Sequence, residues 1–301
     1  MVDNRRATRF IDTLVLGTAQ FGMPYGISNR RGRPDLGRVR EILDIAYQLG
    51  IRTLDTAAAY GESEKVLGTC GVDRWSVITK VPSLKDIDDP DIGDVAYDSV
   101  LRSLDRLGTD KLYAVLAHDR RDAAGDRGRR LRDALAPLVA SGYITKLGVS
   151  VYGPDDMEGI DAGGAQIVQA PLNVFDQRFI TSGAGARLSA VGGELHVRSV
   201  FLQGLLLMST KDRPARFAPW AEELSRFDSQ LEASGLDPAA YCLGFAARQE
   251  AVSRCVVGVE TAEQLSQLVS AFKIGQQADH YTNNLRSDDP RLIDPRQWGT
   301  A

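Results

Sequence analysis

The fold is decided by the stretch IRTLDTAAAYGESE at residues 51–64. It predicts a short apolar strand that ends at Asp55, a turn that carries Tyr60, and a helix that begins near Ser63. A carboxylate at the end of a buried strand needs a partner, because acidic side chains are almost never buried unpaired. A phenol is a weak acid, and a neighbouring cation would make it a better proton donor. The rest of the chain should therefore supply a cation.

The composition is typical of a globular protein with a large core. The 301 residues are 43% hydrophobic and 25% charged, and the net charge of −4 argues against a general nucleic-acid-binding surface. Three scattered cysteines indicate neither a disulfide framework nor a zinc site, so we expect no metal centre. No apolar run approaches the ~20 residues of a membrane helix, and the first residues do not resemble a signal peptide. We expect a cytoplasmic protein.

Eight apolar segments alternate with helical patterns along the chain. The predicted strands cover residues 13–19, 53–57, 76–81, 112–118, 144–151, 165–170, 195–200 and 255–259. The predicted helices cover residues 39–49, from 63 onward, 95–107, 131–140 and 261 to about 272. This alternation predicts a closed (β/α)8 TIM barrel, in a single domain over residues 1–301. The alternative, an open doubly wound sheet, lacks its G-x-G-x-x-G fingerprint after the first strand.

The interval between the seventh and eighth strands is much longer than the others. Its residues 216–231 and 238–248 have helical patterns, which predict a long loop and helical insertion. Residues 202–219 are polar and contain prolines, and we expect a mobile flap over the barrel mouth there. The tail after Ile274 is expected to be an ordered surface segment.

Polar side chains end three consecutive predicted strands. They are Asp55, Lys80 and His118, and Tyr60 follows the first of them. Each has a simpler interpretation: Asp55 could cap a helix or join a structural ion pair, and Lys80 could be solvated. His118 could be a hydrogen-bonded loop residue, and Tyr60 a wall of the mouth. In a barrel, however, the carboxyl ends of the strands surround one mouth, so we expect these four side chains to meet around one point.

The four side chains form a coherent proton-donating set. A buried lysine would favour the phenolate form of Tyr60, and Asp55 would hold that lysine charged and in place. His118 could donate a hydrogen bond to a substrate oxygen or share a proton with the tyrosine. These groups suit the conversion of a carbonyl into an alcohol. They carry no hydride, so a cofactor must supply it.

Motifs along most of the chain resemble those of the aldo-keto reductase family. In order, they are LDTAAAYGESE at 54–64, VITKV at 77–81, His118, KLGVS at 146–150, Gln169, SVFLQGLL at 199–206 and GVETAEQL at 258–265. The resemblance covers about residues 13–272 and is greatest to bacterial members linked to sugar, cell-surface or natural-product biosynthesis. It implies a (β/α)8 barrel, in agreement with the strand count.

The resemblance also implies a catalytic tetrad of Asp55, Tyr60, Lys80 and His118. Tyr60 would be the general acid in reduction and the general base in oxidation. Lys80 and Asp55 would tune it, and His118 would orient the substrate carbonyl. The family binds NADPH, less often NADH, across the carboxyl end of the barrel. The implied cofactor-binding residues are Gly17, Thr18, Asp55, Ser150, Gln169, Arg198, Ser199, Phe201, Gln203, Gly204, Gly258, Glu260 and Gln264.

Two departures from the family pattern concern the nicotinamide end of the cofactor. Val151 replaces an asparagine that contacts the carboxamide together with the counterparts of Ser150 and Gln169. Arg198 stands where an aromatic residue usually stacks on the nicotinamide, unless a shift of register places Phe201 there. A guanidinium can stack on a ring, but a cation beside the oxidised, positively charged nicotinamide is unfavourable. Arg198 at this position would therefore favour the reduced cofactor.

A third departure concerns the 2′-phosphate of NADPH. Glu260 replaces the basic residue that usually holds this phosphate, and Gln264, near a second phosphate-binding position, is uncharged. A carboxylate repels phosphate and could accept a hydrogen bond from a free ribose hydroxyl. The expectation of NADPH is weakened, and NADH becomes an alternative. Lys211 or Arg213 on the long loop could still supply the missing charge.

The expected substrate is a small-molecule carbonyl compound. The candidate contacts are Gln20, Phe21, Tyr25, Tyr60, His118, Asn173 and Arg178. Their polar groups suit a hydroxylated molecule, so we expect a keto-sugar or sugar aldehyde, and neither a nucleic acid nor a membrane as partner. Two other functions stay open. One is a non-catalytic, cofactor-binding regulatory subunit, and the other is an unrelated barrel enzyme such as a phosphate-binding isomerase.

Overall fold

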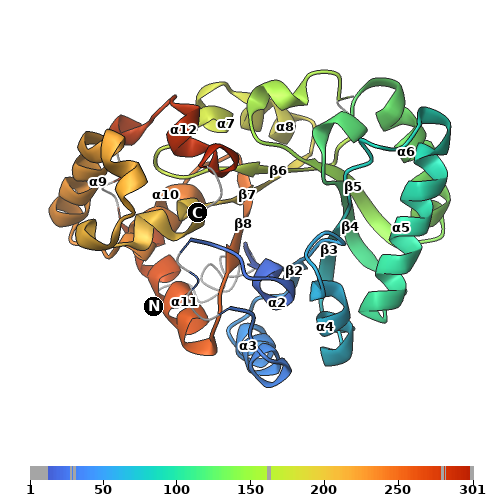
Figure 1. Cartoon of the computed structure of the whole chain (residues 1–301), viewed down its shortest axis with the longest axis horizontal. Helices are drawn as coiled ribbons and strands as arrows, with labels where there is room; N and C mark the ends of the chain where they lie inside the picture. Colours follow the sequence, from blue (N-terminus) through green and yellow to red (C-terminus); the bar gives the residue numbers. More distant parts are fainter. Residues whose placement is uncertain are drawn as a thin grey trace.

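The computed structural model describes residues 13–27, 29, 32–160, 164–278, 281 and 283–298. Its eight parallel strands follow one another around a closed barrel in sequence order, and the eighth pairs with the first. They are β1 (Leu14–Gly17), β2 (Thr53–Asp55), β3 (Ser76–Val81), β4 (Leu112–Ala117), β5 (Ile144–Ser150), β6 (Ile167–Pro171), β7 (Glu194–Arg198) and β8 (Val252–Gly258). Figure 1 shows helices surrounding this barrel. The predicted TIM barrel is confirmed.

Helices lie between the strands and after them. The described ones are α2 (Ala19–Gly22), α3 (Leu36–Gln48), α4 (Ser63–Cys70), α5 (Ile92–Leu107), α6 (Gly125–Ala140), α7 (Arg178–Thr181), α8 (Ala184–Ala190), α9 (Ala221–Ser234), α10 (Pro238–Ala247), α11 (Ala262–Gln277) and α12 (Pro290–Ile293). Helix α6 begins six residues before the predicted start at Leu131, because its first turns are mostly polar and the buried apolar stripe begins only at Leu131. Periodicity detects the stripe and not the polar turns.

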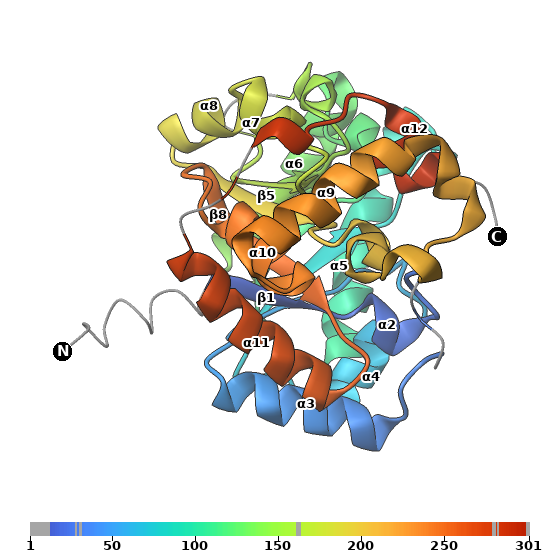
Figure 2. The same cartoon turned by 90° about the vertical axis from the view of Figure 1, so that its left-hand side faces the viewer.

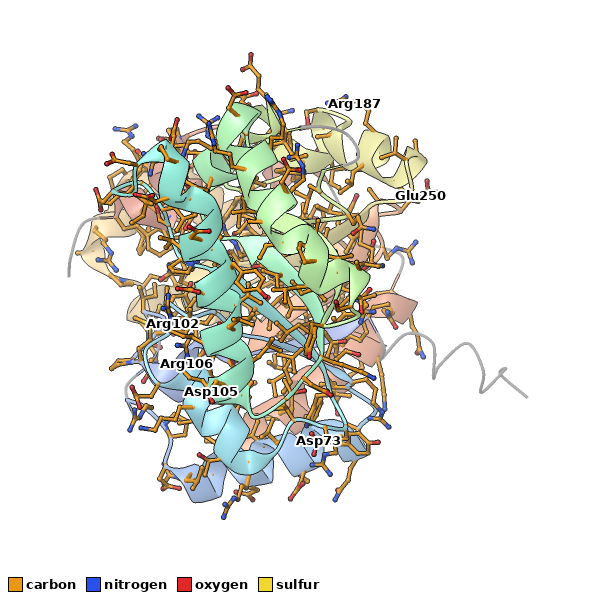
Figure 3. The ribbon with its side chains drawn as sticks, turned by 90° about the vertical axis from the view of Figure 1, so that its right-hand side faces the viewer. Asp73, Arg102, Asp105, Arg106, Arg187 and Glu250 are labelled. Atoms are coloured by element: carbon orange, nitrogen blue, oxygen red, sulfur yellow. The ribbon has the colours of Figure 1, made fainter. Side chains whose placement is uncertain are left out.

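The helices pack on the barrel through apolar stripes. In α5 the buried positions Ile92, Ala96, Val100, Leu104 and Leu107 recur every three or four residues, so they fall on one face of the helix. Figure 3 looks onto α4, α5 and α6, with Arg102 and Asp105 of α5 exposed on the outer side of the helix. Burial of such stripes against the strands forms the outer core of the barrel.

The barrel interior is filled below its mouth. Ile78, Ala114, Leu116 and Ile167 form a buried cluster inside it. At the amino-terminal end of the strands, Glu194 forms an ion pair with Lys146, accepts a hydrogen bond from Tyr113 and is hydrogen-bonded to His196, whose pKa is lowered by burial. The barrel interior is therefore packed rather than open, as in other barrels of this kind, whose active sites lie at the carboxyl-terminal end of the strands.

The interval between β7 and β8 differs from its prediction. Residues 202–219 do not form a free polar flap, because Leu202, Leu205, Leu206 and Phe217 are buried in the core. They form short 3-10 helices over Leu202–Leu207, Thr210–Asp212 and Ala215–Trp220. Helix α9 then begins at Ala221, later than the predicted 216, and α10 follows it. Figure 2 shows α9, α10 and α11 on one flank of the barrel.

The tail packs back onto this insertion. Its residues Leu285, Leu292 and Ile293 are buried, and Trp298 contacts Phe217 with their ring centroids 4.9 Å apart. The indole of Trp220 donates a hydrogen bond to Asp289 at 3.0 Å. The predicted ordered segment is thus partly core. No described helix combines the length and apolar character that crossing a bilayer would require.

Candidate active site

A buried ion pair joins the carboxyl ends of β2 and β3. Lys80 Nζ lies 2.7 Å from Asp55 Oδ1 and donates a second hydrogen bond to the carbonyl of Thr56 at 2.9 Å. The other Asp55 oxygen accepts a hydrogen bond from Gln169 on β6 at 2.7 Å. Asp55 and Lys80 are 3% and 1% exposed, so the charges are compensated by each other and by hydrogen bonds rather than by water.

Tyr60 lies beside this pair. The ammonium of Lys80 is 5.0 Å from the centroid of the Tyr60 ring. Burial by itself lowers the pKa of Lys80, but the Asp55 carboxylate and Tyr60 outweigh burial, and the pKa lies above its ordinary value. Lys80 is therefore a fixed positive charge next to the phenol at neutral pH. A cation in this position would stabilise the negative charge left on the phenol oxygen when its proton is transferred.

His118 completes the cluster at the end of β4. Its ring meets the Tyr60 ring edge to face, with centroids 5.8 Å apart and planes at 83°. Burial and the charge of Lys80 lower the pKa of His118 to about 4. The imidazole is thus neutral near pH 7, and it can donate one hydrogen bond but has no extra proton to give. The structure brings together the four side chains of the predicted tetrad.

The loop that carries Tyr60 is held against the loop after β1. A Cβ atom on Gly22 would lie 1.7 Å from the Tyr60 carbonyl oxygen, so only glycine permits this approach. Gly61 has a φ of +55° and faces Gly22 in turn. Ser63 donates a hydrogen bond to the carbonyl of Thr18 at 2.9 Å. The two loops are packed together and position the phenol.

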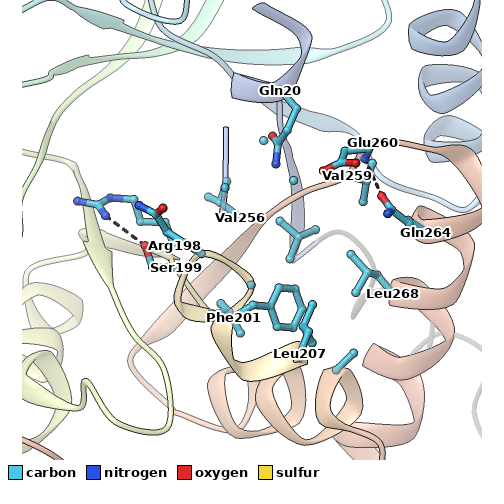
Figure 4. A pocket seen from close by; sticks show the side chains of 18 of the residues that line it. Gln20, Arg198, Ser199, Phe201, Leu207, Val256, Val259, Glu260, Gln264 and Leu268 are labelled. Carbon is cyan, nitrogen blue, oxygen red and sulfur yellow. Dashed lines mark hydrogen bonds between the residues drawn. The ribbon is translucent and has the colours of Figure 1, made fainter. Parts of the chain in front are cut away.

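A long cavity of about 760 Å³ opens beside the cluster. Most of the predicted cofactor and substrate residues line it: Gly17, Thr18, Gln20, Tyr25, Asp55, Tyr60, Gln169, Arg198, Ser199, Phe201, Gln203, Gly204, Gly258, Glu260 and Gln264. Figure 4 shows Arg198 and Ser199 at one end of the cavity and Glu260, Gln264 and Leu268 at the other. Segments after β1, β2, β7 and β8 therefore share one elongated site.

Six predicted site residues are not among those that line the cavity: Phe21, Lys80, His118, Ser150, Asn173 and Arg178. Phe21 is fully buried in the hydrophobic core, and Ser150 is buried at the end of β5, in register with Gln169. Asn173 accepts hydrogen bonds from the backbone of Phe175 and Asp176 and donates one to the carbonyl of Ser199. Its polar atoms thus shape the loop after β6.

Arg178 is likewise engaged by its own loop. It forms a double hydrogen bond with Asp176, both at 2.8 Å, and donates to the carbonyl of Tyr152 at 2.8 Å. Asp176 is buried and close in sequence, so the pair stabilises the loop geometry. Arg178 supports the wall behind Tyr152 rather than the cavity surface.

Sequence reasoning missed an apolar half of the cavity. Leu207, Ala239, Leu268, Ala271 and Ile274 line it. Leu268, Ala271 and Ile274 lie three residues apart on α11, and Gln264 and Gln267 precede them at the same spacing. This spacing places them on one side of the helix and could have indicated from the sequence that they face the cavity. An apolar wall of this kind suits a flat aromatic group.

The loop after β7 contains strained backbone. Ser199, Leu202 and Gln203 have positive φ angles of 59°, 47° and 54°, which non-glycine residues rarely adopt. The carbonyl of Gln203 accepts a hydrogen bond from the backbone of Ile27 at 3.2 Å, so this loop is tied to the loop after β1. Such strain concentrates where surrounding structure holds a binding site in shape.

Glu260 lies at the far end of the cavity, before α11. Its backbone donates a hydrogen bond to the Gln264 side chain at 2.8 Å. Arg213, one of the two residues suggested to supply a positive charge there, is paired with Asp228, and Lys211 is exposed and is not among the residues that line the cavity. Within the described part of the chain, no lysine or arginine lines this end of the cavity. No group of three or more metal-ligating side chains occurs in the same described residues.

The lowered pKa of His118 predicts a pH dependence of stability. Since the folded value of about 4 lies below the ordinary 6.5, the unfolded chain binds more protons between these values. Stability from this residue is full above pH 6.5 and is lost as the pH falls towards about 4. Urea unfolding measures the free energy of unfolding of the wild type and of His118→Gln. The difference between the two should be constant above pH 6.5, and below pH 6.5 the wild type should lose stability relative to the variant. A difference that does not depend on pH would contradict this assignment.

Comparison with known proteins gives a consistent picture. The model of the aldo/keto reductase family matches residues 13–286. Two solved structures of a proposed aldo-keto reductase from Pseudomonas aeruginosa superpose on this chain with TM-scores of 0.64 and 0.63, each at 23% sequence identity. They cover 88% of this chain and 91% and 90% of theirs, and they show a shared fold. No curated protein gives a significant sequence match.

Proposed function

The chain belongs to the aldo/keto reductase family, and from this premise we propose that it reduces an aldehyde or ketone with a nicotinamide cofactor, with Tyr60 as the proton donor. Membership of the family supports an oxidoreductase that acts on carbonyl groups. The observation that carries the finer proposal is the buried Asp55–Lys80 pair, which places a charged ammonium 5.0 Å from the Tyr60 ring at one end of the long cavity.

The cavity fits a nicotinamide dinucleotide. It is elongated, polar near Asp55 and Gln169, and apolar along α11. Gly258 and Gln20 both line it, and an added Cβ on Gly258 would lie 2.5 Å from the Gln20 side chain, so a larger residue there would displace Gln20. Gln169 would hold the carboxamide, Glu260 the ribose, and Leu268 with its apolar neighbours the adenine. The bound cofactor would supply the hydride to the carbonyl carbon.

The protein's own groups would handle the proton. Tyr60 would donate its hydroxyl proton to the carbonyl oxygen, and Lys80 would stabilise the phenolate that results. Asp55 would keep Lys80 charged and in place. His118, neutral because its pKa is about 4, would donate a hydrogen bond to the same oxygen and orient the carbonyl. We assign the acid role to Tyr60 over His118 because the neutral imidazole lacks a proton to transfer.

We also propose a hydroxylated, sugar-type carbonyl as substrate. Gln20 and Tyr25 line the cavity together with Tyr60 and offer polar groups for hydroxyls. Tyr25 is 41% exposed at the rim, where a substrate would enter. A panel of aldoses, keto-sugars and simple aldehydes, followed by cofactor absorbance, tests this class.

The first test of the whole proposal is cofactor binding. Quenching of the intrinsic fluorescence by NADH or NADPH should saturate below millimolar concentrations. Binding of neither cofactor would exclude the reductase proposal. Binding without turnover of any carbonyl compound would support the alternative of a regulatory, cofactor-binding subunit.

Glu260→Arg should shift the cofactor preference towards NADPH. The substitution removes a carboxylate that repels the 2′-phosphate and adds a cation that can bind it. A charge-assisted hydrogen bond contributes about 1.5–3 kcal/mol, so the ratio of the dissociation constants for NADH and NADPH should change roughly tenfold or more. Titration of both variants with both cofactors measures this ratio.

The matched control is Glu263→Arg on the first turn of α11. It makes the same change of charge at a residue that is not among those lining the cavity, and it should leave the ratio nearly unchanged. An equal shift in both variants would indicate a long-range effect of charge and would remove Glu260 from the proposed ribose contact.

A further inference from the structure

Arg198 is a cation without an acidic partner at the Tyr60 end of the cavity. Among the cavity-lining residues that the structure describes, it is the one lysine or arginine. The ion pairs of the described residues do not include it. Three other arginines of the described chain each have a carboxylate of their own: Arg178 pairs with Asp176, Arg213 with Asp228 and Arg296 with Asp294.

Neutral groups hold the Arg198 guanidinium in place. Nη2 donates a hydrogen bond to the carbonyl of Val151 at 3.0 Å, and Nη1 contacts Ser199 Oγ at 3.4 Å. The guanidinium carbon lies 4.4 Å from the centroid of the Tyr152 ring. These contacts fix the direction of the side chain and leave its charge uncompensated. A guanidinium has five N–H donors, so donors remain for a ligand.

The charges at this end of the cavity do not cancel. Asp55 and Lys80 neutralise each other, and His118 is neutral. Arg198 therefore leaves one net positive charge, and its field reaches Tyr25 and His118. The acidic Glu260 lies at the opposite end of the cavity, as Figure 4 shows. An unpaired cation in a partly buried site favours a ligand that brings the missing negative charge.

We propose that Arg198 binds a carboxylate on the substrate, and hence that the substrate is a carbonyl acid: an aldehyde or ketone that also carries a carboxylate, such as an oxidised sugar. The inference rests on the proposed function and narrows its substrate class. A carboxylate matches both the single charge and the planar fork of a guanidinium. A phosphate, with about −1.5 to −2 charges, would leave an excess of negative charge beside Asp55.

The competing role for Arg198 is a contact with the nicotinamide. The two roles differ in what they change. A carboxylate contact discriminates between an acid and its ester, whereas a cofactor contact affects both substrates in the same proportion. The ratio of kcat/KM for an acid and its neutral counterpart, measured at saturating cofactor, therefore reports only the substrate contact.

Two probe pairs suit this measurement: succinic semialdehyde with its methyl ester, and glucuronate with glucose. In the wild type the acid should exceed its neutral counterpart in kcat/KM by about 10–100-fold, the usual effect of a charge-assisted hydrogen bond. Arg198→Met should bring this ratio close to one. Arg198→Lys should retain a preference for the acid, which shows that the loss in the methionine variant is not a folding defect.

Arg296→Met is the matched control. Arg296 also stacks on Tyr152, 3.5 Å from its ring centroid, but it is paired with Asp294 and is not among the residues that line the cavity. Its replacement should leave the acid-to-ester ratio intact. A wild-type ratio near one, or a ratio that survives in Arg198→Met, would overturn the proposal. An equal loss in Arg296→Met would also overturn it, because the effect would then not come from Arg198.

Failure of the proposed function can be told apart from failure of this inference. If no carbonyl compound is turned over, calorimetric titration with succinate and with its neutral diamide still tests the site. Succinate should bind the wild type at least about tenfold more tightly than it binds Arg198→Met, and the diamide should not distinguish them. Equal binding of succinate to both variants would overturn the carboxylate assignment.

Discussion

Tyr60→Phe is expected to lower kcat for carbonyl reduction by about 10²–10⁴-fold, the usual contribution of a positioned general acid. The substitution removes one oxygen atom and keeps the ring that meets His118 edge to face. Since the phenol is assigned to proton transfer and not to holding the cofactor, the dissociation constant for NADH or NADPH should be nearly unchanged. Steady-state turnover and fluorescence titration of the same preparation measure the two quantities.

Tyr25→Phe is the natural control for this experiment. Tyr25 lines the same cavity with part of its side chain exposed, but the protein around its hydroxyl removes water from it and raises its pKa, which Arg198 lowers only in part. Tyr25 is therefore a poorer acid, and its loss should reduce turnover by less than about tenfold. Turnover that persists in Tyr60→Phe but disappears in Tyr25→Phe would transfer the acid role to Tyr25.

Lys80→Met is expected to destabilise the fold by about 3–5 kcal/mol, because it leaves the Asp55 carboxylate buried without its partner. The side chains of Lys80 and Asp55 are 0% and 4% exposed, so water cannot replace the lost interaction. Gln169 would still donate its hydrogen bond but carries no charge. Urea unfolding at neutral pH measures the loss of free energy.

The double variant Asp55→Asn with Lys80→Met separates charge from packing. It removes both charges and keeps an oxygen that can accept from Gln169, so it should recover a large part of the lost stability. Activity should be absent from both variants. If the double variant is no more stable than Lys80→Met, the cost lies in packing around Lys80 and not in an unpaired charge.

The barrel was predictable because its signals are local. Strands buried on both faces are continuous apolar runs, and helices show an apolar stripe, so the order of elements follows from the sequence. The meeting of Asp55, Lys80 and His118 then follows from topology, since neighbouring parallel strands end at the same edge of a barrel. Burial of the 202–219 segment was not predictable, because its leucines lie among turns rather than in a regular period.

Side-chain pairing in loops was the least predictable part of the site. Asn173 and Arg178 are polar residues next to the mouth, and their type alone suggests contact with a substrate. In the structure, Asn173 is hydrogen-bonded to the backbone of its own loop and Arg178 is paired with Asp176. The contact of Arg296 with Tyr152 joins segments more than a hundred residues apart, and a single sequence has no periodic signal for such a pair.

The close approach of Gly22 to the Tyr60 carbonyl has a consequence for the diversification of this barrel. Substrate choice in a barrel enzyme is usually altered by exchanging one loop while the others stay in place. Here the loops after β1 and β2 form one mechanical unit, joined by Gly22, Gly61 and the hydrogen bond from Ser63 to Thr18. A transplanted loop after β1 would displace the phenol unless its counterpart after β2 travelled with it. We therefore expect the loops after β1 and β2 to change together in related barrels, and an engineered exchange should replace both at once.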